Sequence, residues 1–476
     1  MSAVNWAQDA FFEGPEIDSL DGGTTSSGPL WHAISPRWGH SMHTMCSYHG
    51  MFPARLANYF VQKYSQVGDV VLDPFSGRGT TALQARMSGR RIIGNDLNPL
   101  AYVLTRAKAN PPSWLSVLKA VDDLERAFHR GKRKVGDVSA DIKMLFHERT
   151  LTQLVFIKER LLSRPMAEWS SEMFMIAGSL AGIMHGAWRS DGTSLYLSIS
   201  MPNTFSMSPT YVRKFIAEHG LEKLPQDVFE RLRDKLARLY LDDIAGTIGD
   251  VFHEDATNLM GKGPLKPGTV DLVVTSPPYL QVMNYGTANW IRLWLLGLDQ
   301  VSREQGEGRK NLDAKLDHNH RYEGFKDFML RTFRGIERVL KKDGVAIVVI
   351  GDVANPGDTE ALALAGTVWE DLKGQTGLER IELIEDYLKA ENKVSRIWGE
   401  TKGEATNRDC ALVLKRRGGD PFISNAEISW EEPYKDAGPD AAHSRLREIR
   451  EASGQSGAEL LGKCLAPLAP KGARSL

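Results

Sequence analysis

The sequence is poor in the features that mark secreted and membrane proteins. Only three of its 476 residues are cysteines, Cys46, Cys410 and Cys464, an odd number spread far apart. Such usage is typical of a reducing compartment and excludes a framework of disulfides. No apolar run reaches the roughly 18 residues that a membrane-spanning helix needs, and the first residues carry acids without the basic start of a signal peptide. We therefore expect a globular cytoplasmic protein with no membrane partner.

The chain also lacks an excess of charge of either sign. Lys and Arg total 59 and Asp and Glu total 60, which gives a formal net charge of -1. Proteins that bind nucleic acids usually carry an excess of basic residues, so the overall charge does not indicate such a partner. A basic face of limited size is nevertheless enough for phosphate contacts. The basic run at 130–134 is either such a face or a solvated loop.

Apolar patterning divides the chain into five parts. They are a flexible N-terminal lead-in (1–35), a half in which short strands alternate with helices (36–110), a mostly helical insertion (111–248), a second half of the first kind (249–418) and a weakly ordered tail (419–476). Short buried strands that alternate with helices predict an α/β fold with a parallel, Rossmann-like sheet.

Individual elements follow from the same patterns. In the α/β halves we expect strands at 70–72, 91–94, 271–274 and 345–350, helices at 80–87 and 325–340, and a hairpin-like pair at 380–389 and 409–416. In the insertion we expect amphipathic helices at 151–162 and 228–240, with a strand signal only at 194–199. The apolar stripe at 290–296 is typical of core packing.

A glycine-rich loop follows the strand at 70–72. It reads Asp73-Pro74-Phe75-Ser76-Gly77-Arg78-Gly79-Thr80-Thr81. Glycines let the backbone turn sharply and approach a ligand, and loops at the carboxyl ends of parallel strands are where open α/β sheets bind ligands. Asp96 follows the next strand, where its carboxylate can accept hydrogen bonds from ribose hydroxyls. This pattern predicts a nucleoside cofactor without choosing between a nicotinamide and S-adenosylmethionine.

A proline-rich turn, Thr275-Ser276-Pro277-Pro278-Tyr279, follows the strand at 271–274. The two prolines fix the backbone and remove two N–H donors, so the turn offers acceptors only. The Ser276 hydroxyl and the Pro277 carbonyl are acceptors that suit an amine. Tyr279 adds an aromatic face on which a base can stack. The alternative interpretation is a strand-terminating turn with a tyrosine in the core.

Together, the glycine-rich loop and the proline-rich turn resemble the amino-type DNA methyltransferases, and this resemblance implies S-adenosylmethionine as the cofactor. It assigns contacts with the methionine part of the cofactor to one loop, whose residues are Asp73, Pro74, Phe75, Gly77, Gly79 and Thr80. It also implies that Asp96 binds the ribose and that Phe52 closes over the methionine end. Asp255, in the segment Phe252-His253-Glu254-Asp255, matches the acid that binds the adenine amine, with a helix N-cap as the alternative role.

The same resemblance implies a reaction and a substrate. Ser276, Pro277, Pro278 and Tyr279 would hold an exocyclic amine of a base flipped out of double-stranded DNA. Serine at the first position of S-P-P-Y favours cytosine N4 over adenine N6. The alternatives are the same chemistry on RNA or a protein amide, and a catalytically silent nucleic-acid-binding module. The insertion is the candidate target-recognition region, and a cognate restriction nuclease is a candidate partner.

Three histidines and a cysteine recur at every third position, at His40, His43, Cys46 and His49. Structural zinc sites usually pair two separated clusters of ligands, and four ligands at this uniform spacing cannot easily close a tetrahedron. We therefore expect no metal here, and we expect the segment to help form the cofactor pocket.

Overall fold

The computed structural model describes most of the chain in separate ranges. They are 30–35, 38–48, 50, 53–131, 133–186, 196–201, 204–278, 287–298, 322–353, 363–387 and 405–431. Phe52 and Tyr279 lie outside them. Within these ranges, no helix is both long enough and apolar enough to cross a membrane.

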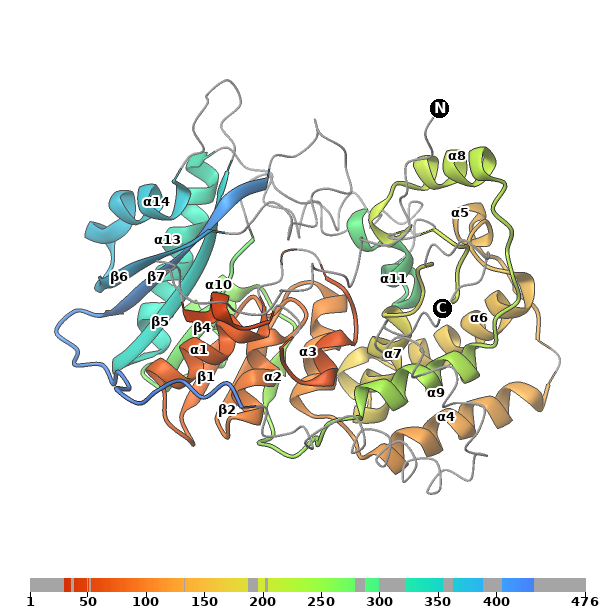
Figure 1. The fold of residues 1–476 in the computed structure, drawn as a ribbon, viewed down its shortest axis with the longest axis horizontal. Helices are drawn as coiled ribbons and strands as arrows, with labels where there is room; N and C mark the ends of the chain where they lie inside the picture. Colours follow the sequence, from red (N-terminus) through yellow and green to blue (C-terminus); the bar gives the residue numbers. More distant parts are fainter. Residues whose placement is uncertain are drawn as a thin grey trace, which may run out of the picture.

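Seven strands form one sheet (Figure 1). They are β1 (Val70–Asp73), β2 (Arg91–Asn95), β3 (Asp250–Phe252), β4 (Val270–Thr275), β5 (Leu340–Val353), β6 (Leu378–Tyr387) and β7 (Ala405–Arg416). Their order across the sheet is β3-β2-β1-β4-β5-β7-β6. The first five in that order run parallel, and β7 is antiparallel to both β5 and β6.

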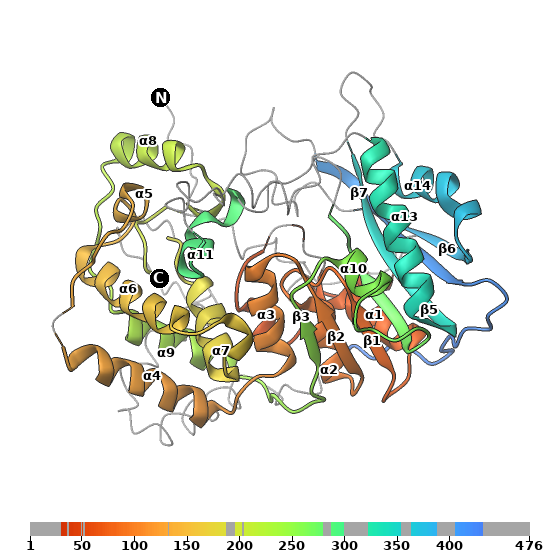
Figure 2. The ribbon, with the colours of Figure 1, turned by 180° about the vertical axis from the view of Figure 1, so that it is seen from behind.

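Helices cover both faces of the sheet because successive strand residues point to opposite sides. Val71 packs against one layer and Leu72 against the other. The first layer contains α1 (Ala54–Tyr64) and α2 (Thr80–Met87), and the second contains α10 (Ala256–Gly261), α13 (Tyr322–Val339) and α14 (Leu364–Leu372). Figure 2 shows α10 and α13 from behind. The fold is therefore the predicted Rossmann-like sheet between two helical layers.

A second group of helices lies to one side of the sheet in both views (Figures 1 and 2). It comprises α4 (Trp114–His129), α5 (Ala140–Lys143), α6 (Glu148–Leu162), α7 (Ser171–Ala181), α8 (Pro209–His219), α9 (Val228–Leu239) and α11 (Trp290–Leu295). Helix α3 (Pro99–Ala109), which follows β2, shares one hydrophobic cluster with this group through Leu100, Val103 and Leu104. The insertion is thus packed continuously onto the first α/β half (36–110).

Short 3-10 helices complete the described elements. They are η1 (Leu30–Ala33), η2 (Ser41–Thr44), η3 (Met166–Glu168), η4 (Thr204–Ser206), η5 (Thr287–Asn289) and η7 (Lys373–Gln375). The indole of Trp290, at the start of α11, donates a hydrogen bond to the carbonyl of Met207 (2.8 Å), which ties α11 to the segment after η4.

Most elements lie where the sequence predicts them. The expected strands, the helices at 80–87 and 325–340 and the antiparallel pair β6–β7 match, and the 290–296 stripe is buried as expected. Strand β3 was not expected from the sequence. The strand expected at 194–199 is wrong over its described part, because residues 196–201 adopt no regular structure. The carbonyl of Ile199 lies only 1.7 Å from where a Cβ on Gly186 would stand, so close packing against another loop dictates its path.

The segment after β7 departs from the expected weakly ordered tail over its described residues, 419–431. It runs along α1, where the backbone amide of Ser424 donates to the carbonyl of Lys63 (2.8 Å) and the backbone amide of Ser429 donates to the side chain of Gln62 (2.9 Å). The indole ring of Trp430 packs edge-on against that of Trp38. Residues 432–476 lie outside the described ranges.

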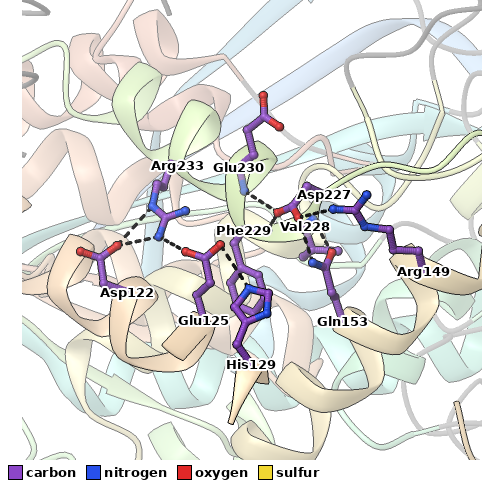
Figure 3. A network of polar contacts seen from close by, with 10 residues as sticks. All are labelled: Asp122, Glu125, His129, Arg149, Gln153, Asp227, Val228, Phe229, Glu230 and Arg233. Atoms are coloured by element: carbon purple, nitrogen blue, oxygen red, sulfur yellow. Dashed lines mark hydrogen bonds and ion pairs between the residues drawn. The ribbon is translucent and has the colours of Figure 1, made fainter. Parts of the chain in front are cut away.

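Polar side chains connect three helices of the insertion (Figure 3). Arg233 of α9 contacts Asp122 (2.6 Å) and Glu125 (2.5 Å) on α4. Asp227 caps the N-terminus of α9 by accepting hydrogen bonds from the amides of Phe229 and Glu230, and it also accepts one from Gln153 of α6. These bonds satisfy helix-end donors and fix α9 against α6.

Replacement of the Asp227 cap should destabilise the fold. Burial by itself would raise the pKa of Asp227, but the bonds from Gln153 and the helix amides, together with Arg149, lower it. We expect Asp227→Ala to lower the free energy of unfolding by about 1–2 kcal/mol at pH 7. Because the folded-state pKa is depressed, this contribution should be present at neutral pH and be lost as the pH falls through it.

The matched control is Asp137→Ala, since Asp137 is an exposed aspartate in the loop before α5. Urea unfolding at pH 7 and at about pH 3 measures both variants. Equal stabilities of the two variants at pH 7 would contradict the capping role.

Candidate functional site

Four parallel strands end at one edge of the sheet and bring the predicted site residues together. Strand β1 ends at Asp73, and Asp96 follows the end of β2. Asp255 comes after β3, and Ser276 directly follows β4. Because these strands are neighbours in the order β3-β2-β1-β4, their carboxyl ends form one continuous edge.

The glycine-rich loop turns at two left-handed residues. Gly77 has a φ of 51° and Gly79 a φ of 76°, values that L side chains rarely adopt. A Cβ on Gly79 would stand 3.0 Å from the Cα of Thr105 in α3, so this glycine also permits a close approach of two backbones. Thr80 then begins α2 and is buried, and its hydroxyl accepts a hydrogen bond from Arg78 (3.1 Å).

Asp96 holds this loop in place. Its Oδ2 accepts a hydrogen bond from the amide of Gly77 (2.8 Å) and its Oδ1 accepts one from the amide of Asn98 (2.8 Å). Burial raises the pKa of Asp96 to about 6, although both amide bonds favour the charged form. Asp96 is therefore mostly ionised at neutral pH, and each carboxylate oxygen keeps a lone pair for a further donor.

Asp73 lies deeper and faces inward, with 1% of its surface exposed. Its Oδ1 accepts hydrogen bonds from the hydroxyl of Thr275 (2.7 Å) and the amide of Phe75 (3.2 Å). Burial raises the pKa of Asp73 to about 7, while these bonds oppose the rise. Direct contact of Asp73 with a cofactor stays a prediction, because the bonds described for this carboxylate lie within the protein.

Two other loop residues make contacts that shape the site. The carbonyl of buried Pro74 accepts a hydrogen bond from the Asn95 side chain (3.0 Å). The half-buried ring of Phe75 packs edge-on against Phe328 of α13, with 5.7 Å between ring centroids. The loop is therefore attached to both β2 and the helical layer behind the sheet.

Asn95 is a site residue that the sequence analysis missed. It is fully buried, and its amide group donates to the carbonyls of Pro74 and Glu254 and accepts from the amide of Glu254 (3.1 Å). One side chain at the end of β2 thereby joins the segments that follow β1 and β3. The only signal in the sequence is a polar residue between the expected strand at 91–94 and Asp96.

Asp255 adopts the alternative role of a helix cap. Its Oδ1 accepts hydrogen bonds from the amides of Thr257 (2.8 Å) and Asn258 (3.2 Å) at the start of α10. Next to it, His253 stacks on Tyr102 of α3 with ring planes 13° apart. Burial is the main reason why the pKa of His253 is lowered. A contact between Asp255 and adenine stays a prediction.

The segment before α1 reaches the glycine-rich loop through Tyr48. The Tyr48 hydroxyl accepts a hydrogen bond from the side chain of Asn98 (3.0 Å), and its ring lies 3.5 Å from where a Cβ on Gly77 would stand.

Within the described ranges, no group of three or more His, Cys, Asp or Glu side chains is placed to hold a metal ion.

Cationic side chains hold the main chain of this segment. Arg78 of the loop donates to the carbonyl of His43 (3.1 Å), Lys235 of α9 to that of Thr44 (2.6 Å) and Arg292 of α11 to that of Ser47 (2.8 Å). Burial lowers the pKa of Lys235 to about 7. The glycine-rich loop, the insertion and α11 thus together position residues 43–47.

Helix α11 and the basic run complete the placement of the predicted features. Arg292 is fully buried, and it also donates to the carbonyl of Ala181 in α7. In the basic run, Arg133 lies over the ring of Phe156 at 4.7 Å. Phosphate contact by the run stays a prediction.

The proline-rich turn is described up to Pro278. Ser276 is half-buried and Pro277 is buried, directly beyond the last residue of β4. Since β1 and β4 pair in parallel, with Leu72 opposite Val273, the turn begins beside the glycine-rich loop. The structure thus places the two predicted halves of the site next to each other.

A sheet of this order, with a glycine-rich loop after β1 and an acid after β2, is a Rossmann-like sheet that suits a nucleoside cofactor. A family model described as DNA methylase matches residues 23–105 and 270–435, just over half of the chain, and the protein belongs to this family. S-adenosylmethionine is the cofactor of the family. The two left-handed glycines and the lone pairs of Asp96 suit such a ligand.

Known relatives share part of the chain. Type II methyltransferase M.MvaI of Kocuria varians is 25% identical over 252 residues, covering 50% of this chain and 53% of that protein. Type II methyltransferase M.BsoBI of Geobacillus stearothermophilus is 22% identical over 314 residues, covering 60% and 59%. The chain therefore spans little more than half the length of these relatives. Among solved structures, the rRNA methyltransferase AviRa of Streptomyces viridochromogenes aligns with a TM-score of 0.26 and 12% identity, over 78% of this chain and 89% of that one.

Loss of the Asp96 carboxylate should weaken cofactor binding. We expect Asp96→Ala to raise the Kd for S-adenosylmethionine about 10- to 100-fold, because hydrogen bonds to a charged group are lost. In the wild-type protein, affinity should fall as the pH drops below about 6, where Asp96 becomes protonated.

Asp250→Ala is the matched control, since Asp250 is an exposed acid at the start of the adjacent strand β3. Calorimetric titration between pH 5 and pH 8 gives both results. An Asp96→Ala protein that is folded and binds like Asp250→Ala would remove Asp96 from the binding site.

Proposed function

We propose that this protein methylates DNA at an exocyclic amino group, with cytosine N4 favoured over adenine N6. The observation that carries the proposal is the pairing of β1 with β4, which sets a glycine-rich cofactor loop beside an acceptor-rich turn at the same sheet edge. Membership of the DNA methylase family and the type II methyltransferases among the relatives support the substrate.

The turn suits the chemistry because an exocyclic amine needs orientation more than covalent activation. When bound, S-adenosylmethionine supplies an electrophilic methyl group. The Ser276 hydroxyl and the Pro277 carbonyl would accept the two N–H bonds of the amine, which directs the nitrogen lone pair at that methyl group. We further propose that the base is flipped out of the duplex and stacks on Tyr279.

Within the protein, each site group has a separate task in this proposal. The left-handed turn at Gly77 and Gly79 would bring the loop backbone close to the methionine part of the cofactor, with Phe52 closing over it. Asp96 would accept ribose hydroxyls with its remaining lone pairs. Asp255 would offer its second carboxylate oxygen to the adenine amine, since only its Oδ1 is used in the described capping bonds.

The proposed reaction can be read directly in cellular DNA. We expect genomic DNA from a methylation-free host expressing the protein to carry one modified base in a defined sequence context, as measured by single-molecule sequencing. The modified base distinguishes cytosine N4 from adenine N6. Host DNA free of modification, together with unmodified RNA and protein from the same cells, would favour the silent-module alternative.

Variants of the turn should separate its two tasks. Tyr279→Ala removes a stacking face worth about 1–3 kcal/mol per base, so single-turnover methylation should slow while cofactor affinity persists. Tyr279→Phe is the matched control and should keep substantial activity. Ser276→Ala removes one amine acceptor and should slow the chemical step more than it weakens DNA binding. A wild-type rate in Tyr279→Ala would contradict the stacking role.

A further inference from the structure

A buried hydrogen bond links the start of the glycine-rich loop (the cofactor loop) directly to the start of the proline-rich turn (the catalytic turn). The hydroxyl of Thr275 donates to Oδ1 of Asp73 over 2.7 Å, and the two side chains are 0% and 1% exposed. Asp73 is the last residue of β1, immediately before the glycine-rich loop. Thr275 is the last residue of β4, immediately before Ser276. The bond therefore joins the end of β1 to the end of β4, where the glycine-rich loop and the proline-rich turn begin.

The backbone ladder does not reach this far along the strands. The described pairs between β1 and β4 are Val71 with Leu272 and Leu72 with Val273. Beyond them the side chains take over, because Thr81 in the first turn of α2 also donates its hydroxyl to the carbonyl of Val274 (3.3 Å). Two threonine hydroxyls thus connect the strand that leads to the turn with the loop and helix that follow β1.

The bridge also accounts for an acid that is otherwise costly. A carboxyl group removed from water favours its neutral form, and this burial raises the pKa of Asp73 to about 7. Bonds from the Thr275 hydroxyl and the amide of Phe75 act in the opposite direction. An apolar residue at the end of β1 would avoid the cost, so the carboxylate at this position has a use that packing alone does not explain.

We propose that Thr275 is a positioning residue, which sets the distance between the catalytic turn and the cofactor loop through its bond to Asp73. This inference rests on the proposed function. In-line methyl transfer needs the amine nitrogen about 3–3.5 Å from the methyl carbon and aligned with it, and in this proposal different loops hold the two partners. The Asp73–Thr275 bridge joins these loops at their shared base. In this proposal Thr275 acts through Ser276 and Asp73 and not by contact with either substrate.

The test compares isosteric and conservative variants. Thr275→Val keeps the shape and removes the hydroxyl, whereas Thr275→Ser keeps the hydroxyl. Thr332→Val is the matched control, because Thr332 is an equally buried threonine in α13 that bonds only a helix carbonyl of Phe328 in the described contacts. We expect Thr275→Val to lower the single-turnover methylation rate about 10- to 100-fold, with the Kd for S-adenosylmethionine changed by less than about threefold. Thr275→Ser should recover most of the rate.

Two results with an active wild-type enzyme would overturn the proposal. One is a Thr275→Val rate equal to that of Thr332→Val. The other is a loss of cofactor affinity as large as the loss of rate, which would make Thr275 part of the cofactor site instead.

A wild-type protein that methylates nothing would defeat the proposed function, and hydrogen exchange then decides the bridge by itself. S-adenosylmethionine should slow exchange in peptides covering the glycine-rich loop of both wild type and Thr275→Val. In the peptide that contains Thr275 and Ser276, it should slow exchange only in the wild type. Equal protection of that peptide in both proteins would overturn the bridge.

Discussion

Parallel pairing of β1 with β2 on one side and β4 on the other is the constraint on which the site depends. It places the residues after three strands at one edge, although they come from positions about 200 residues apart in the chain. The insertion between β2 and β3 does not disturb this arrangement, since its helices pack beside the sheet and not across it (Figures 1 and 2). The insertion therefore leaves the arrangement of the site residues unchanged. It adds a group of helices beside the sheet.

That group of helices is tied to the site by cations that bind carbonyl groups. Lys235 and Arg292 come from the insertion and from α11, and Arg78 comes from the cofactor loop, yet all three hold main-chain carbonyls between His43 and Ser47. A buried cation needs good hydrogen-bonding partners, so each of these contacts is directional and costly to break. Through Tyr48, the segment that they hold reaches Gly77 and Asn98. A displacement of the helical group would consequently also displace the glycine-rich loop.

Three acids at the sheet edge differ because their surroundings differ. Asp73 is enclosed and serves an internal bridge, Asp96 is half-buried and pins the loop while keeping lone pairs, and Asp255 caps α10. Sequence alone presents them as equivalent carboxylates at strand ends. Burial and local donors separate them, which is why the pKa of Asp73 is raised to about 7 and that of Asp96 to about 6.

The sequence by itself determined the fold class and the positions of the glycine-rich loop and the proline-rich turn, because strand periodicity, closely spaced glycines and a double proline are local signals. It also located Asp96, since the residue after the second strand of such a sheet has a fixed place. Only the tertiary structure decided the roles of Asn95 and Tyr48 and formed the bridge between Asp73 and Thr275. Their roles depend on partners far away in the chain, and no local pattern distinguishes an asparagine that joins two loops from one in solvent. The same holds for residues 196–201, where close packing against Gly186 overrode a β-type pattern, and for 419–431, where hydrogen bonds to α1 fixed a polar segment.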